Sequence, residues 1–334
     1  LKHKYPKEFF CAILEVAEFE QDPLKVIAEV NRELPHFGIR LLPPSLEDSS
    51  MDFKIVGPNI RYGFSSIKGI TPKAKENLEE FVKLNPKNKY DVFAYAQQCK
   101  INITALSSLI QAGALGEEFR AKKVLEARAY GLLTEREKRN FHRIGPEYDY
   151  LLLESIMDAV TTNKLAEDGK PVMKATRFET FKRKFAPLKA LYLENKKREK
   201  LSIWWFEKSL LGYSFTLTLR DCFNESDYLG TLGQLRDTKS GYTRAVVQVE
   251  DFLVRISKAG NRYMRVTIAD DADKMDAFLS DSPKSTKLSD FLDNNELKKK
   301  DIIIVEVKDG EKATFLESIT VVDAKIFTKA RELT

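Results

Sequence analysis

Apolar residues recur at helical spacing from the start of the chain. Residues 6–19 carry them at intervals of three and four, which predicts an amphipathic helix. Asp22 followed by Pro23 supplies an N-cap and a first-turn proline for a second helix. A pair of adjacent prolines then breaks the pattern. We therefore expect an exposed loop over residues 41–50 and a short strand at residues 53–56.

The helical pattern continues to about residue 211. Residues 60–111 alternate short helical runs with turns that contain glycine, and residues 121–211 form one long helical stretch. Breaks in this stretch are expected near Gly145-Pro146 and over residues 167–171, where turn-forming residues gather. The first part of the chain is therefore predicted to be mostly α.

After residue 212 the pattern changes to short β-rich runs separated by turn residues. Five such runs are present, at residues 245–256, 263–268, 274–278, 301–307 and 314–322. Leu288 lies in a short helical segment between the third and fourth runs. This order matches the five-stranded Greek-key barrel, or OB-fold, that binds oligonucleotides. The predicted fold class is multidomain α + β, mostly helical first and ending in a small five-stranded OB-type β-barrel.

A tight glycine turn at Gly69 is the first feature that suggests a binding partner. It joins a short helical segment to a second helix, for which Thr71 is the N-cap and a proline is the first residue. Amides at such a helix start point outward. With Lys68, Lys73 and Lys75 beside them they form a seat for phosphate that does not read sequence. A helix terminated by glycine beside solvated lysines is the alternative.

A second glycine turn repeats this arrangement. The apolar helix near residues 105–112 ends on Gly113, and three cations follow it, namely Arg120, Lys122 and Lys123. Alone, this segment fits a core helix with a glycine C-cap. Two such units together favour a tandem helix-hairpin-helix region that grips DNA phosphates. We therefore predict DNA contacts at both turns.

The β-rich part contains a further basic turn. Its candidate residues flank a glycine and are Arg255, Lys258, Arg262, Tyr263 and Arg265. Bases stack on aromatic side chains at roughly 1–3 kcal/mol per base, while a basic groove follows the phosphates. This combination suits a single strand, and a solvated β-hairpin is the alternative.

Composition narrows the classes of protein. A chain of 334 residues, 43 % hydrophobic and 31 % charged, is expected to fold into two or three soluble units. Its net charge is only +5, so nucleic-acid binding must depend on local clusters of Lys and Arg. The three cysteines lie far apart, and no apolar run is long enough for a signal peptide or a membrane span, which fits the cytoplasm. Because the chain starts at Leu1, we expect a fragment.

Patterns for catalysis are missing from the sequence. The three histidines are isolated, and neither a P-loop nor a zinc pattern occurs. Asp271 and Asp273 could formally hold Mg²⁺ as a carboxylate pair, but we interpret them as a turn between strands. The sequence therefore predicts no catalytic residue, metal ligand or cofactor in this chain.

Several motifs occur in a characteristic order. They are LKHKYPKEFFCA at residues 1–12, GIRLLPPSLEDS at 38–49, RYGFSSIKGI at 61–70, LIQAGAL at 109–115 and EKSLLGY at 207–213. In this order they resemble the last part of the fingers, the hairpins and the approach to the OB domain in the alpha subunit of bacterial DNA polymerase III, the C-family replicative polymerase. Glu47 replaces the usual Asn, Thr71 replaces a second Gly, and no His-Pro follows Tyr213, so hairpin affinity is expected to be reduced.

The resemblance implies four regions. Residues 1–57 would end the fingers-like helical region, 58–134 would form the tandem helix-hairpin-helix DNA-binding region, 135–235 a helical connector and 236–334 the OB-fold. Such a portion would hold duplex phosphates with its hairpins and single-stranded template with its barrel. The palm aspartates that bind Mg²⁺ would lie upstream, so this chain is expected to be inactive alone, although part of a nucleotidyltransferase.

Primer-template DNA is the expected partner, and the resemblance implies the sliding clamp and other replisome subunits as further partners. It also implies a location at the nucleoid of a bacterium or of a phage-infected host. Residues 135–200 contain no clamp-binding peptide. The segment from Gln248 to Phe252 matches the sequence pattern of such a peptide but lies in a predicted strand. Two alternatives stay open. One is a separately encoded DNA-binding or scaffold subunit of a split polymerase. The other is a protein-interaction platform without DNA contact, whose binding would depend little on salt.

Overall fold

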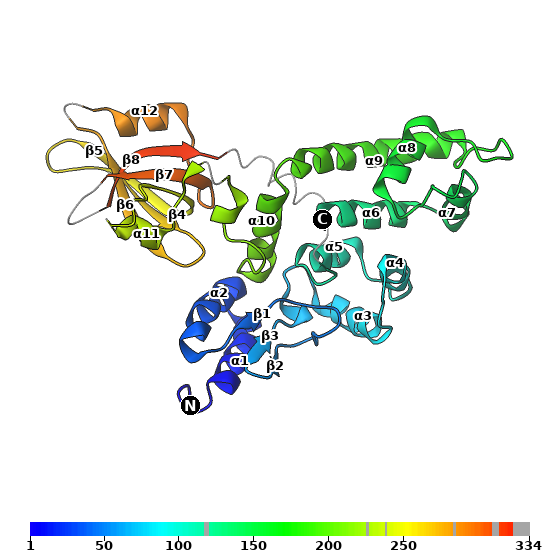
Figure 1. Cartoon of the computed structure of the whole chain (residues 1–334), viewed down its shortest axis with the longest axis horizontal. Coiled ribbons are helices and arrows are strands. Elements are labelled where there is room, and N and C mark those ends of the chain that lie inside the picture. Colours follow the sequence, from blue (N-terminus) through cyan, green and yellow to red (C-terminus); the bar gives the residue numbers. More distant parts are fainter. Residues whose placement is uncertain (117–119, 225–226, 238, 283–284, 309–313, 323–334) are drawn as a thin grey trace. The chain divides into compact units, whose positions relative to one another are not determined.

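The computed structural model describes residues 1–116, 120–224, 227–237, 239–282, 285–308 and 314–322. Its internal contacts divide the chain into two compact units, one within Leu1–Phe215 and one that begins at Thr216 (Figure 1). We call them the helical unit and the barrel unit. The barrel unit begins before residue 236, the predicted start of the OB-fold region. The division into four regions stays a prediction.

The helical unit opens with two helices and a small sheet. In chain order its first elements are α1 (Pro6–Val16), η1 (Ala17–Phe19), α2 (Pro23–Glu33), η2 (Leu34–Phe37), β1 (Leu41–Leu42), β2 (Lys54–Val56) and β3 (Asn59–Arg61). The carboxylate of Asp22 accepts from the N–H of Lys25 at 3.3 Å, so it caps α2 as predicted. In the sheet, β3 is central, parallel to β1 and antiparallel to β2.

The middle of the helical unit contains four helices after a single 3-10 turn. These elements are η3 (Phe64–Ser66), α3 (Pro72–Lys83), α4 (Lys89–Gln98), α5 (Ile103–Gln111) and α6 (Arg120–Leu132). Thr71, Asn88 and Asn102 start α3, α4 and α5 by accepting from backbone N–H groups three residues on, at 3.3, 3.0 and 2.8 Å. The apolar faces of these helices share one core with α1 and α2.

The last helices of this unit surround a second core. They are α7 (Glu135–His142), α8 (Leu153–Thr162), α9 (Ala175–Lys196) and α10 (Glu199–Leu211). Both predicted breaks fall between helices, the first after α7 and the second after α8. Phe141, Leu153, Phe181 and Phe185 are buried together, and Figure 1 shows α9 running along α6 and α8. This packing of apolar faces accounts for the long helical stretch in the sequence.

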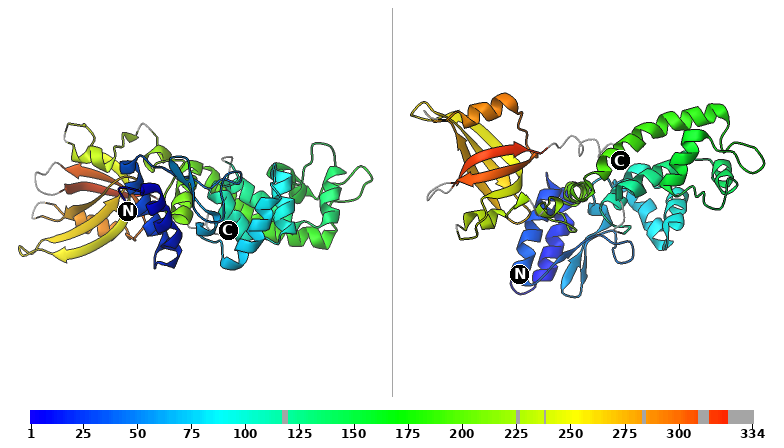
Figure 2. Two further views of the ribbon diagram at one scale, coloured as in Figure 1. Left: turned by 90° about the horizontal axis from the view of Figure 1, so that it is seen from below. Right: turned by 45° about the horizontal axis from the view of Figure 1, so that its top comes forward.

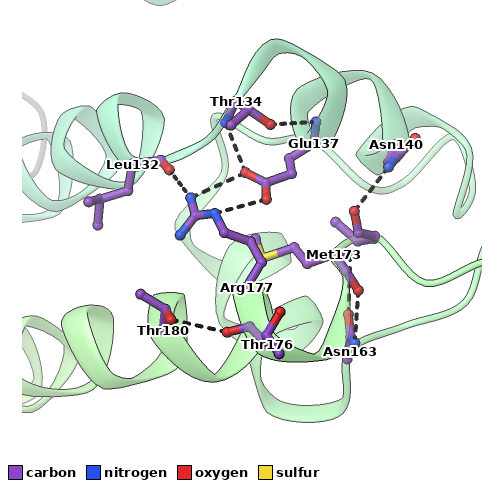
Figure 3. A network of polar contacts seen from close by, with 10 residues as sticks. Leu132, Thr134, Glu137, Asn140, Asn163, Met173, Thr176, Arg177 and Thr180 are labelled. Carbon is purple, nitrogen blue, oxygen red and sulfur yellow. Dashed lines mark hydrogen bonds and ion pairs between the residues drawn. The ribbon is translucent and has the colours of Figure 1, made fainter.

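A polar network joins α7 to α9 (Figure 3). Arg177 on α9 points at the carboxylate of Glu137 on α7, with 3.1 Å between Nε and Oε1, and also donates to the carbonyl of Leu132. Glu137 in turn accepts from the backbone N–H of Thr134 at 2.9 Å, which closes a capping box. One carboxylate therefore serves both the start of α7 and its contact with α9.

A buried ion pair joins α6 to α10. The side chains of Arg120 and Glu207 are 3 % and 1 % exposed, and Nη1 lies 2.7 Å from Oε1. Arg120 also donates to the carbonyl of Gln111 at 3.1 Å. Glu207 accepts from the hydroxyl of Ser214 at 3.0 Å and from the N–H of Phe215 at 2.6 Å. Each charge thus has several partners, which is the condition under which buried charges are tolerated.

The barrel unit has the architecture expected from the strand pattern. Its elements are η4 (Arg220–Cys222), α11 (Leu232–Arg236), β4 (Arg244–Ile256), β5 (Arg262–Ala269), β6 (Lys274–Ser280), α12 (Lys287–Asn294), β7 (Ile302–Lys308) and β8 (Thr314–Val321). The strands close in the order β4-β5-β6-β8-β7, with β6 and β8 parallel and the other pairs antiparallel (Figure 2). The predicted fold class, a helical part followed by an OB-type barrel, is confirmed.

Alternation along the strands decides which side chains fill the barrel. On β5, Met264, Val266 and Ile268 are buried in its core, so Tyr263 and Arg265 lie on the outer face. A bulge in β4 between Val249 and Asp251 shifts the pairing with β5 by one residue. Because side chains alternate along a strand, every second residue of β5 and β6 points to the outer face of the barrel.

Loss of the buried arginine should destabilise the helical unit strongly. Both tryptophans of the chain lie on α10, so their fluorescence reports the unfolding of this unit. In Arg120→Ala the carboxylate of Glu207 stays buried without its cation, and we expect the free energy of unfolding to fall by about 3–5 kcal/mol. Urea denaturation followed by tryptophan fluorescence measures this loss. The matched control is Arg183→Ala on the exposed side of α9, which should cost less than about 0.5 kcal/mol. Similar losses in the two variants would contradict the role of the ion pair.

Candidate nucleic-acid interface

The first glycine turn presents backbone N–H groups that have no acceptor among the described residues. The chain turns through Gly69 at a φ of +101°, and the N–H of Ile70 donates back to Ile67 at 3.1 Å. Among the described residues, no hydrogen bond uses the N–H groups of Gly69, Thr71 or Lys73. N–H groups at a helix start carry partial positive charge and attract anions. This turn can therefore hold a phosphate oxygen.

Two of the three predicted lysines at this turn are open to solvent. Lys68 and Lys73 are exposed, and neither takes part in an ion pair within the part of the chain that the structure describes. Lys75 is engaged, because its ammonium lies 2.9 Å from a carboxylate oxygen of Asp52. The hydrogen bond to Asp52 raises the pKa of Lys75 above its ordinary value. The hydroxyl of Thr71 is used in capping α3, so its role is to start the helix.

Two contacts hold the first turn against the rest of the helical unit. The N–H of Lys68 donates to the carbonyl of Leu210 on α10 at 3.0 Å. A Cβ added to Gly69 would lie 2.5 Å from the hydroxyl oxygen of Ser108 on α5, so the turn approaches α5 as closely as glycine permits. The first turn is thus packed on the helix whose end forms the second turn.

The second glycine turn has a different use, and the prediction that Arg120 contacts DNA is wrong. Gly113 has a φ of +81°, and a Cβ there would lie 2.6 Å from Nη2 of Arg120. The guanidinium occupies the space that the missing side chain leaves, and it is buried against Glu207. An arginine with 3 % exposure cannot reach a phosphate on the surface. Gly113 therefore serves the internal ion pair.

The two lysines after Arg120 also make contacts within the protein. The ammonium of Lys122 lies 2.8 Å from a carboxylate oxygen of Glu154, and that of Lys123 donates to the carbonyl of Leu115 at 2.8 Å. Lys123 lines an open cavity of about 380 Å³ beside the second turn, together with Lys87 and Lys89. Glu47 lines the same cavity and opposes an anion there. Contacts between DNA and Lys122 or Lys123 stay predictions.

A row of outward side chains crosses four strands of the barrel. Arg265 on β5 pairs with Leu253 on β4 and with Phe278 on β6, and Phe278 pairs with Phe315 on β8. Leu253 and Phe315 are each 44 % exposed, and the two phenylalanine rings lie 6.2 Å apart. Sequence reasoning identified Arg265 but missed Phe278 and Phe315. The period of two in β6 and β8 was the signal that could have placed them on the outer face.

The next pairs along β5 extend this face. Tyr263 pairs with Arg255 on β4 and with Ser280 on β6, and it lies on the same side of β5 as Arg265. Arg262 points to the other side of the strand, and Lys258 lies in the turn that Gly260 allows with a φ of +80°. The structure therefore brings Arg255, Tyr263 and Arg265 together and separates Arg262 from them.

Two other interpretations from the sequence are confirmed. The aspartates between β5 and β6 form a turn, where Asp270 accepts from the N–H groups of Ala272 and Asp273 at 2.9 and 2.6 Å. The clamp-like segment at residues 248–252 lies in β4 and is paired with β5.

No group of three His, Cys, Asp or Glu side chains suited to a metal ion occurs among the residues that the structure describes. None of its described helices is both long enough and apolar enough to cross a membrane.

Residues 38–125 match a family model described as a helix-hairpin-helix motif. Over 94 % of its length the chain is 26 % identical to DNA polymerase III subunit alpha of Campylobacter jejuni, and the aligned part is 25 % of that protein. The subunit of Thermus aquaticus is 37 % identical over 34 % of the chain, which is 9 % of that protein. The subunit of Mycobacterium tuberculosis is 32 % identical over 37 % of the chain, which is 10 % of that protein. The chain thus spans about a quarter or less of these relatives. The resemblance that the order of motifs predicted is confirmed.

Substitution of the glycine at the first turn should disturb this surface. Alanine at position 69 would adopt a φ of +101° and meet Ser108, and we expect a loss of about 1–2 kcal/mol or more in unfolding free energy. Gly131→Ala on α6 is the matched control, because a Cβ there meets nothing within 4 Å and helical glycine is disfavoured. Urea denaturation followed by tryptophan fluorescence compares the two. Equal stability of both variants would show that the turn adopts another conformation.

Proposed function

We propose that this chain is a DNA-binding portion of a C-family replicative polymerase alpha subunit. The first hairpin would hold phosphates of the primer-template duplex, and the outer face of the barrel would hold single-stranded template. One observation carries the proposal: three N–H groups without an acceptor among the described residues lie at a turn that also carries two exposed lysines, inside a segment that matches the helix-hairpin-helix model. Relatives that match the chain are named DNA polymerase III subunit alpha.

The hairpin surface suits phosphates regardless of base sequence. The N–H groups of Gly69, Thr71 and Lys73 can bind anionic oxygens, and Lys68 and Lys73 add charge at the same turn. Contacts of this kind fix the position of a duplex and carry no direct base readout. A replicative polymerase must hold every sequence equally, so this chemistry fits the proposed role.

The barrel surface suits an unpaired strand. Tyr263, Phe278 and Phe315 offer rings on the outer face, and Arg255 and Arg265 lie beside them. Rings bind bases by stacking, and the cations follow the backbone. Bases within a duplex are already stacked on each other, so such a face selects single-stranded template.

The parent subunit would perform the chemistry. By resemblance, palm aspartates upstream of this portion hold Mg²⁺ and extend primers from deoxynucleotides, while the sliding clamp and other replisome subunits are further partners. The described residues would position DNA behind that site, at the bacterial nucleoid. A separately encoded subunit of a split polymerase would use the same surfaces.

Removal of the hairpin lysines should weaken duplex binding in a salt-dependent way. For Lys68→Ala/Lys73→Ala, we expect the slope of log affinity against log salt to become shallower by about 2, because each phosphate contact contributes about 0.9. Fluorescence anisotropy with a labelled blunt duplex at several salt concentrations measures the slope. Lys4→Ala/Lys83→Ala removes the same charge from exposed positions outside the turn and should leave the slope nearly unchanged. If the affinity of the native chain for DNA does not change with salt concentration, the result would instead support the interaction-platform alternative.

Loss of the barrel rings should weaken binding of single strands only. Tyr263→Ala and Phe278→Ala each remove one stacking surface worth roughly 1–3 kcal/mol, so affinity for a primer-template overhang should fall by about tenfold. Tyr263→Phe keeps the ring and should bind normally. Phe19→Ala removes a ring that is 81 % exposed in the helical unit and serves as the control. A parallel loss of affinity for blunt duplex would argue against separate sites for the two forms of DNA.

A further inference from the structure

Two stacked tyrosines lie outside the strands of the barrel. The ring centroids of Tyr228 and Tyr242 are 4.7 Å apart, and their planes are inclined by only 16°. Tyr242 comes shortly before β4 and is half-buried, whereas Tyr228 is 58 % exposed. Tyr228 therefore covers one face of its partner and keeps much of its own surface in solvent.

The backbone at Tyr228 adopts a conformation that a bulky residue rarely takes. Its φ is +48°, in the left-handed region that side chains with a Cβ avoid. Hydrogen bonds on both sides hold it there: the N–H of Gly230 donates to the carbonyl of Arg244 at 2.7 Å, and Nη1 of Arg244 donates to the carbonyl of Asp227 at 3.3 Å. A strained residue kept in place by its surroundings is a feature of functional sites.

Glycine makes room for the stack. A Cβ on Gly230 would lie 2.8 Å from the ring of Tyr242, so any other residue at this position would displace the ring. A Cβ on Gly241 would come 3.8 Å from the hydroxyl of Tyr228, which is ordinary contact. The stack is therefore built into the backbone that precedes β4.

The register places the tyrosines next to the aromatic row of the barrel. The N–H of Val307 on β7 donates to the carbonyl of Thr243 at 2.8 Å, so Tyr242 lies beside the end of β7. On the other side of β7, Lys308 pairs with Phe315, a member of the row. Two strand spacings, about 10 Å, thus separate Tyr242 from Phe315 around the barrel.

We propose that the stacked pair Tyr228–Tyr242 is a platform for one unpaired nucleobase, as an extension of the single-strand surface on the barrel. The inference rests on the proposed function of that surface. A third planar ring placed on the open side of Tyr228 would extend an existing stack, and stacking of this kind accepts every base. Continuity with Phe315 and Phe278 favours a nucleobase as the occupant over the proline-rich peptides that also dock on tyrosines.

The test uses the whole chain and variants chosen to keep its fold. Tyr228→Asn removes the ring but suits a positive φ, Tyr228→Phe keeps the ring, and Tyr263→Ala removes a ring from the neighbouring surface. Binding of single strands of about 20 and about 6 nucleotides is measured by anisotropy, since sites on such barrels span roughly 4–16 nucleotides. A 2-aminopurine base moved along the longer strand reports stacking at each position by the quenching of its fluorescence.

We expect Tyr228→Asn to weaken binding of the longer strand by about tenfold, to leave the shorter strand unaffected and to abolish quenching at one end of the strand only. Tyr228→Phe should match the native chain. If the native chain binds and Tyr263→Ala weakens it, but Tyr228→Asn changes neither affinity nor quenching, the platform is overturned while the proposed function stands. If the native chain binds no single strand, both are overturned. Capture of a proline-rich peptide by Tyr228, with DNA binding unchanged in Tyr228→Asn, would also overturn it.

Discussion

The buried ion pair between Arg120 and Glu207 is the contact on which the helical unit depends. Through the partners of these two charges it joins the end of α5, the start of α6, the end of α10 and residues 214–215. A charge left alone at this depth is costly, so these segments must come together for any of them to be stable. Residues 109–115 and 207–213, which carry much of the family resemblance, meet at this pair. Packing and charge compensation thus account for the contact between these two segments.

The candidate phosphate seat depends on the same assembly. The first turn is fixed to α10 by the bond from Lys68 to Leu210 and approaches Ser108 on α5 through Gly69. Both helices are partners in the ion-pair region, so the N–H groups of the turn are held on rigid elements. Because these donors are already in position, the turn does not have to become ordered when an anion binds. The second turn differs from the first, because its glycine makes room for the buried side chain of Arg120.

Strand alternation separates the interior of the barrel unit from its outer face. The five strands close into a barrel, so the side chains on its outer face are available to a partner. Register across β4, β5, β6 and β8 aligns Leu253, Arg265, Phe278 and Phe315 in one row, and β7 lies between this row and the stacked pair Tyr228–Tyr242. Several aromatic rings therefore lie on the outer face of the closed barrel, where the proposed function places an unpaired strand.

The sequence by itself determined the features that depend on close neighbours in the chain. The caps at Asp22 and Thr71, the helical breaks, the five strands and the turn at Asp271 and Asp273 all rest on residues a few positions apart, and all are present. Only the tertiary structure decided which charged and aromatic residues are available to a partner. Arg120 is neutralised by Glu207, Lys75 by Asp52 and Lys122 by Glu154, whereas Phe278 gains Phe315 as a neighbour. These pairs join distant segments, and burial and pairing across such separations follow from packing, which no local pattern of residues encodes.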